Sequence, residues 1–410
     1  MSVPDEKEHN VRASLLELLL NTGVAVGQAE RKVFVGRCAG SSEQMLLEAF
    51  ASGAMSAGAD VLNAGVIPAP TLALSSAGKG CSFMVPADPS LILRNSSGLA
   101  IDVPSGPSAL PAYDRVGRLA ELSDPVLRHK EIVIKDLGNA DCPVIIDCSS
   151  DCSSLIVPDL LSEMGCDVIC IHSDLNPLGR KGIDETDLKD LITMTSQNTG
   201  GIGIAVNSDG TRIAAVDESG RYISGETILA LFIQYLEPKK VVVPSVTSML
   251  IDELTKGEVL RSGPTDRSIG ESIAFHGADI GGGPSGSFYF PKHTLCPDAV
   301  YAAALLSKIA GEGRLNEMID TLPEYCMDHL NIAFDSDLAE FSKKISENVR
   351  SLEYRKLTEK DGWRVEMESG WFLIHFPASG YITITAEARD KVYMVMLMDV
   401  AKGLVENALK

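Results

Sequence analysis

The sequence predicts an α/β protein made of three consecutive α/β domains with mixed sheets, followed by a smaller α+β domain. Two observations support this fold class. Short apolar runs bounded by turn residues alternate with helical runs along most of the chain, which is the pattern of α/β proteins. At the C-terminal end, two alternating strands are instead followed by one long helix. With 410 residues the chain is too long for a single core, and we expect about two to four domains.

The first predicted domain, residues 1–138, begins with a helix and continues with strand–helix alternation. Its expected elements are a helix at residues 11–22, a strand at 32–35, a helix at 44–56, and a strand from residue 59 that ends in a Pro-rich turn. Ser41 or Ser42 is expected to cap the second helix, with Glu43 in its first turn.

The later domains are predicted at residues 139–238, 239–348 and 349–410. In the second domain we expect strands at 143–147 and 167–172, and helices at 155–164 and 184–191 after an acidic linker at 136–141. The third begins with a strand within 239–248 and a helix to 256, and the fourth has a hairpin within 362–376 and a C-terminal helix to 408. Each strand is bounded by turn residues, and the helix at 184–191 has an acidic first turn.

Composition limits the partners that the chain is suited to bind. The sequence is 45% hydrophobic and 22% charged, with a net charge of −20, and this charge opposes nucleic acid and anionic membranes. No apolar run reaches the ~18–20 residues that a membrane helix needs. The run at residues 15–20 is short and broken by Glu17, so it is not expected to be a signal peptide. We therefore expect a cytoplasmic protein without nucleic-acid or membrane partners.

Nine cysteines occur, mostly in apolar segments, which favours buried free thiols in a reducing compartment. Cys142, Cys148, Cys152, Cys166 and Cys170 lie close in sequence, with His172 nearby. Their spacing lacks the paired C-x₂-C pattern of common zinc sites. Core packing is therefore the favoured interpretation of this cluster, and a metal site is the alternative.

The strongest candidate site is the loop at residues 207–212, between two apolar strands. Asn207, Asp209 and Thr211 place oxygen atoms at alternate positions, a spacing that can converge on Mg²⁺ or Ca²⁺. Only one of the three is ionised, so the predicted metal site is weak. An EF-hand would need Gly where Arg212 stands and helices in place of strands, and this alternative is disfavoured.

The same loop, with residues 220–231 after it, resembles the metal loop of the α-D-phosphohexomutases, the phosphomannomutase/phosphoglucomutase family. That family carries D-G-D-x-D-R followed by V-D-E-x-G-R-x-L-S-G-D. Framework residues that match other family motifs include Gly36, Arg37, Ser41, Ser42, Gly65, Pro68 and Pro70. The resemblance covers nearly the whole chain, and it implies the four-domain, heart-shaped architecture of the family.

The functional loops depart from the family pattern. Where the family has T-A-S-H-N-P, alignment on Pro89 places Pro86 at the phosphoserine position, and proline has no hydroxyl. The metal loop keeps Arg212 and one carboxylate. In the sugar-binding loop, G-G-E-x-S-G-H in the family, Ser285 and Gly286 remain.

The phosphate loop of the family, R-P-S-G-T-E-P, is also altered. Ser379 and Gly380 remain here, but Phe376 replaces the first arginine. The guanidinium contacts that hold a phosphate are thereby lost, although Ser379 and Gly380 can still form a small anion nest.

From these changes we expect a phosphohexomutase-related protein of carbohydrate metabolism with mutase activity lost or strongly reduced. It would act by binding a ligand, a sugar phosphate or another small molecule, or as a partner of an active relative. One alternative is an active intramolecular phosphotransferase on a hexose phosphate with a different nucleophile and metal site. Another is a scaffold subunit in a hetero-oligomer with an active mutase. The Mg²⁺ site is expected to be weak or absent, and the sequence leaves open a homo- or hetero-oligomer.

Overall fold

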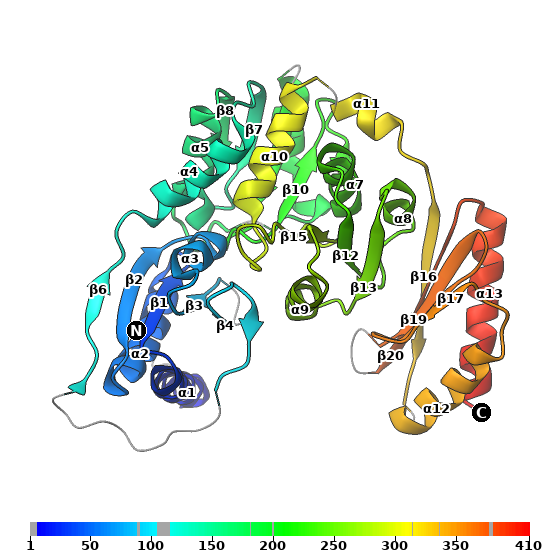
Figure 1. The fold of residues 1–410 in the computed structure, drawn as a ribbon, viewed down its shortest axis with the longest axis horizontal. Helices are drawn as coiled ribbons and strands as arrows, with labels where there is room; N and C mark the ends of the chain where they lie inside the picture. The colour runs from blue at the N-terminus through cyan, green and yellow to red at the C-terminus, as the bar shows by residue number, and fades with distance from the viewer. Residues whose placement is uncertain are drawn as a thin grey trace. The chain divides into compact units, whose positions relative to one another are not determined.

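A computed structural model describes residues 6–87, 91–104, 115–180, 182–198, 201–313, 315–335, 337–376 and 380–410, with side chains from residue 13 onward. The chain divides into two compact units, and Figure 1 labels their helices and strands. The first unit comprises Met1–Ile228 and Ser285–Asn316, and the second comprises Leu229–Pro284 and Glu317–Lys410. Several mixed sheets in a four-domain-like arrangement confirm the predicted α/β class, whereas the individual domain boundaries stay a prediction.

The first sheet of the first unit has the order β5-β4-β3-β1-β2-β6. Its strands are β1 (Lys32–Arg37), β2 (Asp60–Val66), β3 (Cys81–Val85), β4 (Ile92–Arg94), β5 (Ala100–Ile101) and β6 (Leu119–Glu121). Its helices are α1 (Glu6–Ala29), α2 (Ser41–Ser56), α3 (Ala69–Ser76) and α4 (Pro125–Leu137). Strand β1 pairs in parallel with β2 and β3, and β4 is antiparallel to β3, so the sheet is mixed as expected.

The central strand β1 is apolar on both faces because helices cover both. Val33 and Val35 pack in one core with Phe50 of α2. Phe34 points to the opposite core, where it packs with Leu72 of α3. Alternate side chains of a strand point to opposite faces, which explains why this strand appears in the sequence as an unbroken apolar run.

The predicted cap of α2 is wrong. The helix begins at Ser41, its N-cap residue is Gly40, and no side chain makes a capping hydrogen bond. A Cβ on Gly40 would lie 2.1 Å from Oε2 of Glu43. The Glu43 carboxylate therefore folds back over the helix start, into the space that a capping side chain would occupy.

The second sheet of the first unit has the order β11-β10-β9-β7-β8. Its strands are β7 (Pro143–Asp147), β8 (Asp167–Ile171), β9 (Ile202–Val206), β10 (Ile213–Val216) and β11 (Tyr222–Ile223). The helical elements of this part are the 3₁₀ helices η2 (Cys152–Leu155) and η3 (Glu185–Asp187), with α5 (Val157–Glu163), α6 (Lys189–Gln197) and α10 (Ala299–Gly311). Strands β9 and β10 form an antiparallel hairpin around the predicted metal loop, as the sequence pattern indicated.

Two predicted boundaries in this region are corrected. The helix expected at residues 184–191 is a 3₁₀ turn followed by α6, and Leu188 and Leu191 both lie in the core. The acidic linker begins later than expected, because α4 continues to Leu137. Asp136 lies within that helix and is paired with Lys292 at 2.7 Å.

The second unit contains a parallel set of strands and a separate antiparallel sheet. The parallel strands are β12 (Lys240–Pro244), β13 (Glu258–Ser262) and β14 (Ile280–Gly282), with α8 (Leu250–Leu254) and α9 (Asp266–His276). The antiparallel sheet, in the order β16-β20-β19-β18-β17, consists of β16 (Cys326–Ala333), β17 (Lys356–Thr358), β18 (Trp363–Glu366), β19 (Gly370–His375) and β20 (Tyr381–Ala388). Helices α12 (Leu338–Arg350) and α13 (Lys391–Ala408) pack on this sheet. The predicted C-terminal hairpin and helix are therefore confirmed.

Three short elements complete the chain. Helix α7 (Gly225–Leu236) passes from the first unit into the second, β15 (Phe288–Tyr289) belongs to the first unit, and α11 (Leu315–Asp320) leads back to the second. None of the helices in the described ranges has the length and apolar character needed to cross a lipid bilayer.

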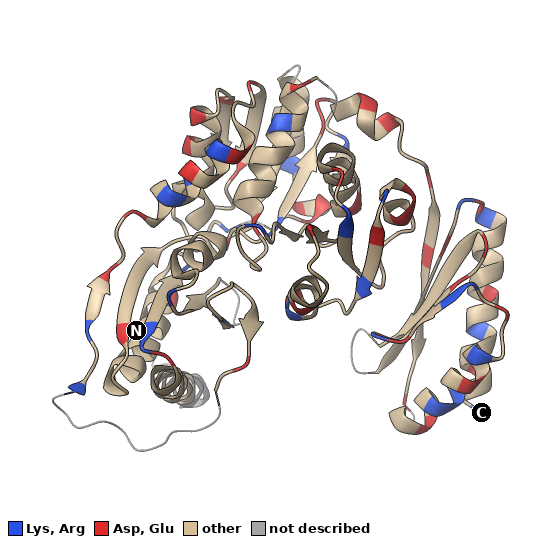
Figure 2. Cartoon of the chain, in the orientation of Figure 1, with Lys and Arg blue, Asp and Glu red and all other residues tan. Residues whose placement is uncertain are grey.

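Residues of both charge signs are interspersed along α12 and α13 (Figure 2). On α12, Lys344 pairs with Glu340 at 3.0 Å, and on α13 Lys402 lies 3.8 Å from Glu406. Both pairs have the i,i+4 spacing that adds a few tenths of a kcal/mol to an exposed helix, about 0.2–0.5. The outer faces of these helices are thus suited to water.

A buried carboxylate after β10 provides a pH-dependent test of this fold. Asp217 is 2% exposed and accepts hydrogen bonds from Ser219 and Arg221, including Nε of Arg221 at 2.7 Å. Burial alone would raise the pKa of Asp217, but the bonds from Ser219 and Arg221 outweigh it and lower the pKa. A lowered folded-state pKa means that the stabilisation is present above about pH 4 and is lost as the pH falls through the folded pKa.

We therefore expect Asp217→Asn to reduce the unfolding free energy by about 1–2 kcal/mol at pH 7. The difference from the wild type should shrink below about pH 4, as the pH falls through the lowered folded pKa of Asp217 and the wild-type carboxylate becomes neutral. Urea unfolding of both proteins across this range measures the difference. A difference that does not change with pH would contradict the prediction.

Candidate functional site

The loop at residues 207–212 is closed by hydrogen bonds among the three predicted ligand residues. Oδ1 of Asp209 accepts from Nδ2 of Asn207 at 2.7 Å and from Oγ1 of Thr211 at 2.6 Å. Oδ1 of Asn207 accepts from the backbone N–H groups of Thr211 and Arg212, at 2.8 and 2.9 Å. These two backbone donors fix the orientation of the Asn207 amide, because the flipped amide would present N–H groups to N–H groups.

This arrangement does not match the donor set of a Mg²⁺ site. Mg²⁺ requires near-octahedral oxygen ligands, usually with carboxylates, and here the Asn207 amide directs its N–H groups, not its oxygen, toward Asp209. Burial raises the pKa of Asp209, although bonds from Thr211 and Asn207 and the charge of Arg94 oppose this. The structure thus brings the three predicted residues together, but their side chains are hydrogen-bonded to one another. Their role as metal ligands stays a prediction.

The backbone of the same loop connects several parts of the first unit. The carbonyl of Asp209 accepts from the N–H of Ala69 at 2.8 Å, and the carbonyl of Gly210 accepts from the N–H of Ala299 at 3.1 Å. Gly210 has a φ of +73°, and a Cβ on it would lie 2.7 Å from Cβ of Pro68. Glycine is required there because of both the backbone conformation and the close approach.

Part of the predicted sugar-binding loop lies next to this hairpin. The backbone N–H of Ile213 donates to the carbonyl of Gly286 at 3.0 Å, and Arg212 forms an isolated antiparallel bridge with Ser287. Ser285 and the side chain of Arg212 are exposed, whereas Gly286 is buried with a φ of +76°. Two loops that are far apart in sequence, and that were both predicted to carry function, therefore meet in one place.

The predicted phosphoserine position lies in the same unit. Pro86 directly follows β3 and is buried. Strand β3 is the parallel neighbour of β1, and the N–H of Cys38 donates to the carbonyl of Val85 at 2.9 Å. Pro86 thus lies next to the end of β1. Residues 88–90, which complete the aligned motif, are outside the described residues.

The two retained residues of the predicted phosphate loop belong to the second unit. Gly380 is exposed with a φ of +91°, and its carbonyl accepts from the N–H of Phe334 at 2.9 Å. Ser379 lies outside the described residues. The predicted anion nest at this loop therefore stays a prediction.

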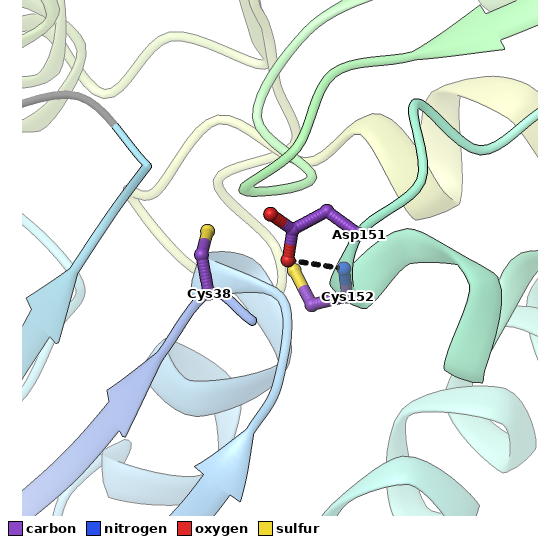
Figure 3. A group of neighbouring side chains, drawn as sticks. All are labelled: Cys38, Asp151 and Cys152. Atoms are coloured by element: carbon purple, nitrogen blue, oxygen red, sulfur yellow. Dashed lines mark hydrogen bonds between the residues drawn. The ribbon is translucent and has the colours of Figure 1, made fainter. Parts of the chain in front are cut away.

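The structure also shows a polar cluster that the sequence did not indicate. Cys38, after β1, meets Asp151 and Cys152 at the start of η2 (Figure 3), and all three are fully buried. Both thiols donate to the carbonyl of Ser208 in the 207–212 loop, Cys152 at 2.7 Å and Cys38 at 3.5 Å. This cluster therefore lies directly against the predicted metal loop.

Arg180 binds this cluster on one side. Its Nε lies 2.5 Å from Oδ2 of Asp151, its Nη1 lies 2.8 Å from Oε1 of Glu43, and it also donates to the carbonyl of Ala39. Burial raises the pKa of Asp151, against the lowering effect of the bonds from Ala39, Arg180 and Cys152. Ala39 and Asp151, which are 112 residues apart in sequence, are joined by a 2.7 Å hydrogen bond. No local spacing could have indicated such a contact.

The cysteine cluster predicted from sequence divides into separate groups. All nine cysteines are free, and seven are buried, in agreement with the expected core packing, but the prediction is wrong for Cys170, which is exposed on β8. Cys142 and Cys166 approach to 3.9 Å between their sulfur atoms. Cys152, however, pairs with Cys38, which lies outside the predicted cluster.

Comparison with known proteins agrees with this architecture. The family models described as phosphoglucomutase/phosphomannomutase, alpha/beta/alpha domain I and domain III match residues 7–89 and 224–325. The probable phosphoglucosamine mutase of Methanosarcina barkeri is 33% identical over 419 residues, which cover 96% of each chain.

Solved structures show the same fold. A phosphoglucomutase/phosphomannomutase family protein from Burkholderia thailandensis superposes with a TM-score of 0.82 at 17% identity, over 96% of this chain and 94% of that one. The N-acetylphosphoglucosamine mutase of Aspergillus fumigatus, in complex with GlcNAc-6P and magnesium, has a TM-score of 0.56 at 13% identity, over 92% and 82%. With a relative of 33% identity along almost its full length, the chain belongs to the α-D-phosphohexomutase family, that of the phosphoglucomutases and phosphomannomutases.

Proposed function

We propose that this chain is a phosphohexomutase homologue in which phosphoryl transfer is lost or strongly reduced, and that it acts by binding a sugar phosphate or as a partner. The observation that carries the proposal is Pro86 at the end of β3, the position that aligns with the phosphorylated serine of the family. A mutase must carry a phosphoryl group on a side-chain oxygen or comparable nucleophile, and proline has none.

The state of the 207–212 loop supports the same proposal. Phosphoryl transfer depends on a divalent cation and positive groups that neutralise charge in the transition state. Asp209 is the single carboxylate among the three candidate ligands, and it is already bonded to Asn207 and Thr211. We infer that any Mg²⁺ site in this loop is weak or absent.

The ligand class follows from the relatives and from the residues that remain. The relatives include probable phosphoglucosamine mutases, and one solved neighbour contains GlcNAc-6P. Ser285 is exposed beside the 207–212 loop and keeps the hydroxyl of the sugar-binding motif. A hexosamine phosphate is therefore the first ligand to test for this chain.

Purified protein is expected not to interconvert the 1- and 6-phosphates of glucosamine, glucose or mannose with Mg²⁺ and a bisphosphate activator. Pro86→Ser is expected to remain inactive as well, because a hydroxyl alone restores neither the cation nor the phosphate contacts. An active phosphoglucosamine mutase assayed in parallel serves as the control. Turnover by the wild-type chain, in a preparation free of host mutase, would overturn the proposal.

Binding is tested separately by thermal shift, since a ligand that binds the native state raises its midpoint. Glucosamine 6-phosphate should raise the melting temperature, whereas Mg²⁺ alone should not.

Three results would favour the alternatives. Phosphate located on a serine by mass spectrometry, or Mg²⁺ binding that Asp209→Ala abolishes, would indicate an active phosphotransferase. Co-purification with an active mutase would indicate a scaffold subunit.

A further inference from the structure

The cluster of Cys38, Asp151 and Cys152 brings three metal-binding side chains together in the interior of the first unit. Their ligand atoms all lie within 4.8 Å of one another, and each residue is 0% exposed. Figure 3 shows Cys38 on one side of the cluster and Asp151 and Cys152 on the other. The backbone N–H of Cys152 donates to the Asp151 carboxylate. Two thiols and a carboxylate form a donor set that is found at zinc sites in proteins.

A fourth possible metal ligand already faces the same point. The carbonyl oxygen of Ser208 accepts a hydrogen bond from each thiol, at 2.7 Å from Cys152 and 3.5 Å from Cys38. If both thiols lost their protons, this carbonyl oxygen would lose two hydrogen-bond donors and would be free to bind a cation. Two sulfur and two oxygen atoms would then surround one point, which suits a four-coordinate ion.

We propose that Cys38, Asp151, Cys152 and the carbonyl of Ser208 form a binding site for a thiophilic divalent cation of the Zn²⁺ class. Zn–S bonds of about 2.3 Å in a tetrahedron place two sulfur atoms about 3.8 Å apart. The ligand atoms are within 4.8 Å as observed, so side-chain adjustments of about 1 Å are enough to reach that geometry. The inference does not depend on whether phosphoryl transfer is retained.

The charges around the cluster favour a cation. Asp151, Glu43 and Asp209 are carboxylates, whereas the cations are Arg180, the partner of the first two, and Arg94, whose charge acts on Asp209. Oδ1 of Asp151 accepts from the N–H groups of Ala39 and Cys152, both at 2.7 Å. These bonds and the Arg180 contact hold the carboxylate in a fixed orientation, as partners of metal ligands commonly do.

The chemistry of binding involves no oxidation. Each thiol loses its proton to solvent, each sulfur forms one bond to the cation, and two protons are released for each ion bound. The hydrogen bond with Cys152 lowers the pKa of the Cys38 thiol, but burial and the nearby Asp151 and Asp209 carboxylates raise it overall. Burial also raises the pKa of Cys152. A cation that binds here must therefore displace both thiol protons, which is why two protons are released for each ion.

The test uses the full chain after treatment with a chelator, titrated with Zn²⁺ and, as a spectroscopic probe, with Co²⁺. We expect one Zn²⁺ per chain, release of two protons, and a sulfur-to-cobalt charge-transfer band. Cys38→Ser and Cys152→Ser should each weaken binding at least tenfold. The double variant Cys142→Ser/Cys166→Ser is the matched control, because it removes another buried thiol pair, 3.9 Å apart, and should bind as the wild type does.

Folding of the metal-free variants is checked by cooperative thermal unfolding, and a second measurement avoids variants altogether. X-ray absorption of the Zn²⁺-loaded wild type should show two sulfur neighbours at about 2.3 Å together with oxygen neighbours. The proposal is overturned by any of three results: no stoichiometric binding, binding unchanged in both single variants, or an ion surrounded by nitrogen and oxygen only.

Discussion

Replacement of Gly53 with valine is expected to lower the unfolding free energy of the first unit by about 3 kcal/mol, the upper part of the range for overpacked cores. Gly53 lies in α2, and a Cβ on it would be 2.0 Å from the carbonyl oxygen of Leu20 in α1. Gly23 of α1 makes the reciprocal approach, with a Cβ position 2.0 Å from the carbonyl oxygen of Phe50. The obstructing atoms belong to the backbone, so a side-chain rotation cannot relieve the contact, and the two helices must separate.

Thermal unfolding measures this effect, and a lowering of the midpoint by roughly 6–12 °C corresponds to it. Gly403 provides the control, because it also lies in a helix, α13, but has open space around its Cβ position. Gly403→Ala should stabilise the protein by about 0.5–1 kcal/mol through helix propensity. A Gly53→Val protein with the wild-type midpoint would show that α1 and α2 do not pack as described.

Arg364→Met is expected to destabilise the second unit by about 3–5 kcal/mol, as found when one member of a buried charged pair is removed. Arg364 is 1% exposed, donates to the carbonyls of Ser245 and Thr247 at 2.6 and 3.1 Å, and stacks on the Trp371 ring at 3.7 Å. Its Nε also lies 3.5 Å from Oε1 of Glu366. Without the guanidinium, the carbonyl of Ser245 loses a donor, that of Thr247 retains Arg261, and Glu366 loses an ion-pair partner.

The same arginine is held in an unfavourable environment for a charge. Burial and the neighbouring Arg261 lower the pKa of Arg364 to about 9. The double variant Arg364→Met/Glu366→Gln also removes the charge of the carboxylate that faces the arginine. It should therefore recover part of the stability that Arg364→Met loses. Urea unfolding of the single and double variants measures the coupling.

Arg355 is the matched control for Arg364. It lines the same cavity, of about 460 Å³, but its side chain is exposed. Arg355→Met should change the stability by no more than about 0.5 kcal/mol, as is usual for surface substitutions. Equal losses for Arg355→Met and Arg364→Met would contradict a special role for the buried guanidinium.

Much of the fold could be predicted from the sequence because the relevant signals are local. The apolar run at β1 and the paired strands β9 and β10 carry their pattern within a few residues, and turn residues mark where each strand ends. The start of α2 was predicted incorrectly, since the Glu43 carboxylate occupies the space where a cap would lie. A cap rule describes a helix end in isolation and takes no account of a side chain that folds back over it.

The candidate site was only partly predictable. The 207–212 loop and Ser285 were recognised from residue spacing and from the resemblance, and the first unit does bring their segments together through the bridge between Arg212 and Ser287. The orientation of the Asn207 amide could not be predicted, because it depends on two backbone donors that meet it only in the folded hairpin.

The sequence by itself determined the family, the strand–helix order and the absence of a hydroxyl at Pro86, since each is a property of residue identity and local spacing. Only the tertiary structure placed Cys38 against Asp151 and Cys152, and Arg364 against the carbonyls of Ser245 and Thr247. These contacts join segments that are distant in the chain, and the packing of sheets and helices decides which distant segments meet. The physical reason is that burial and hydrogen-bond partners belong to the folded environment of a residue and are not encoded by its neighbours in sequence.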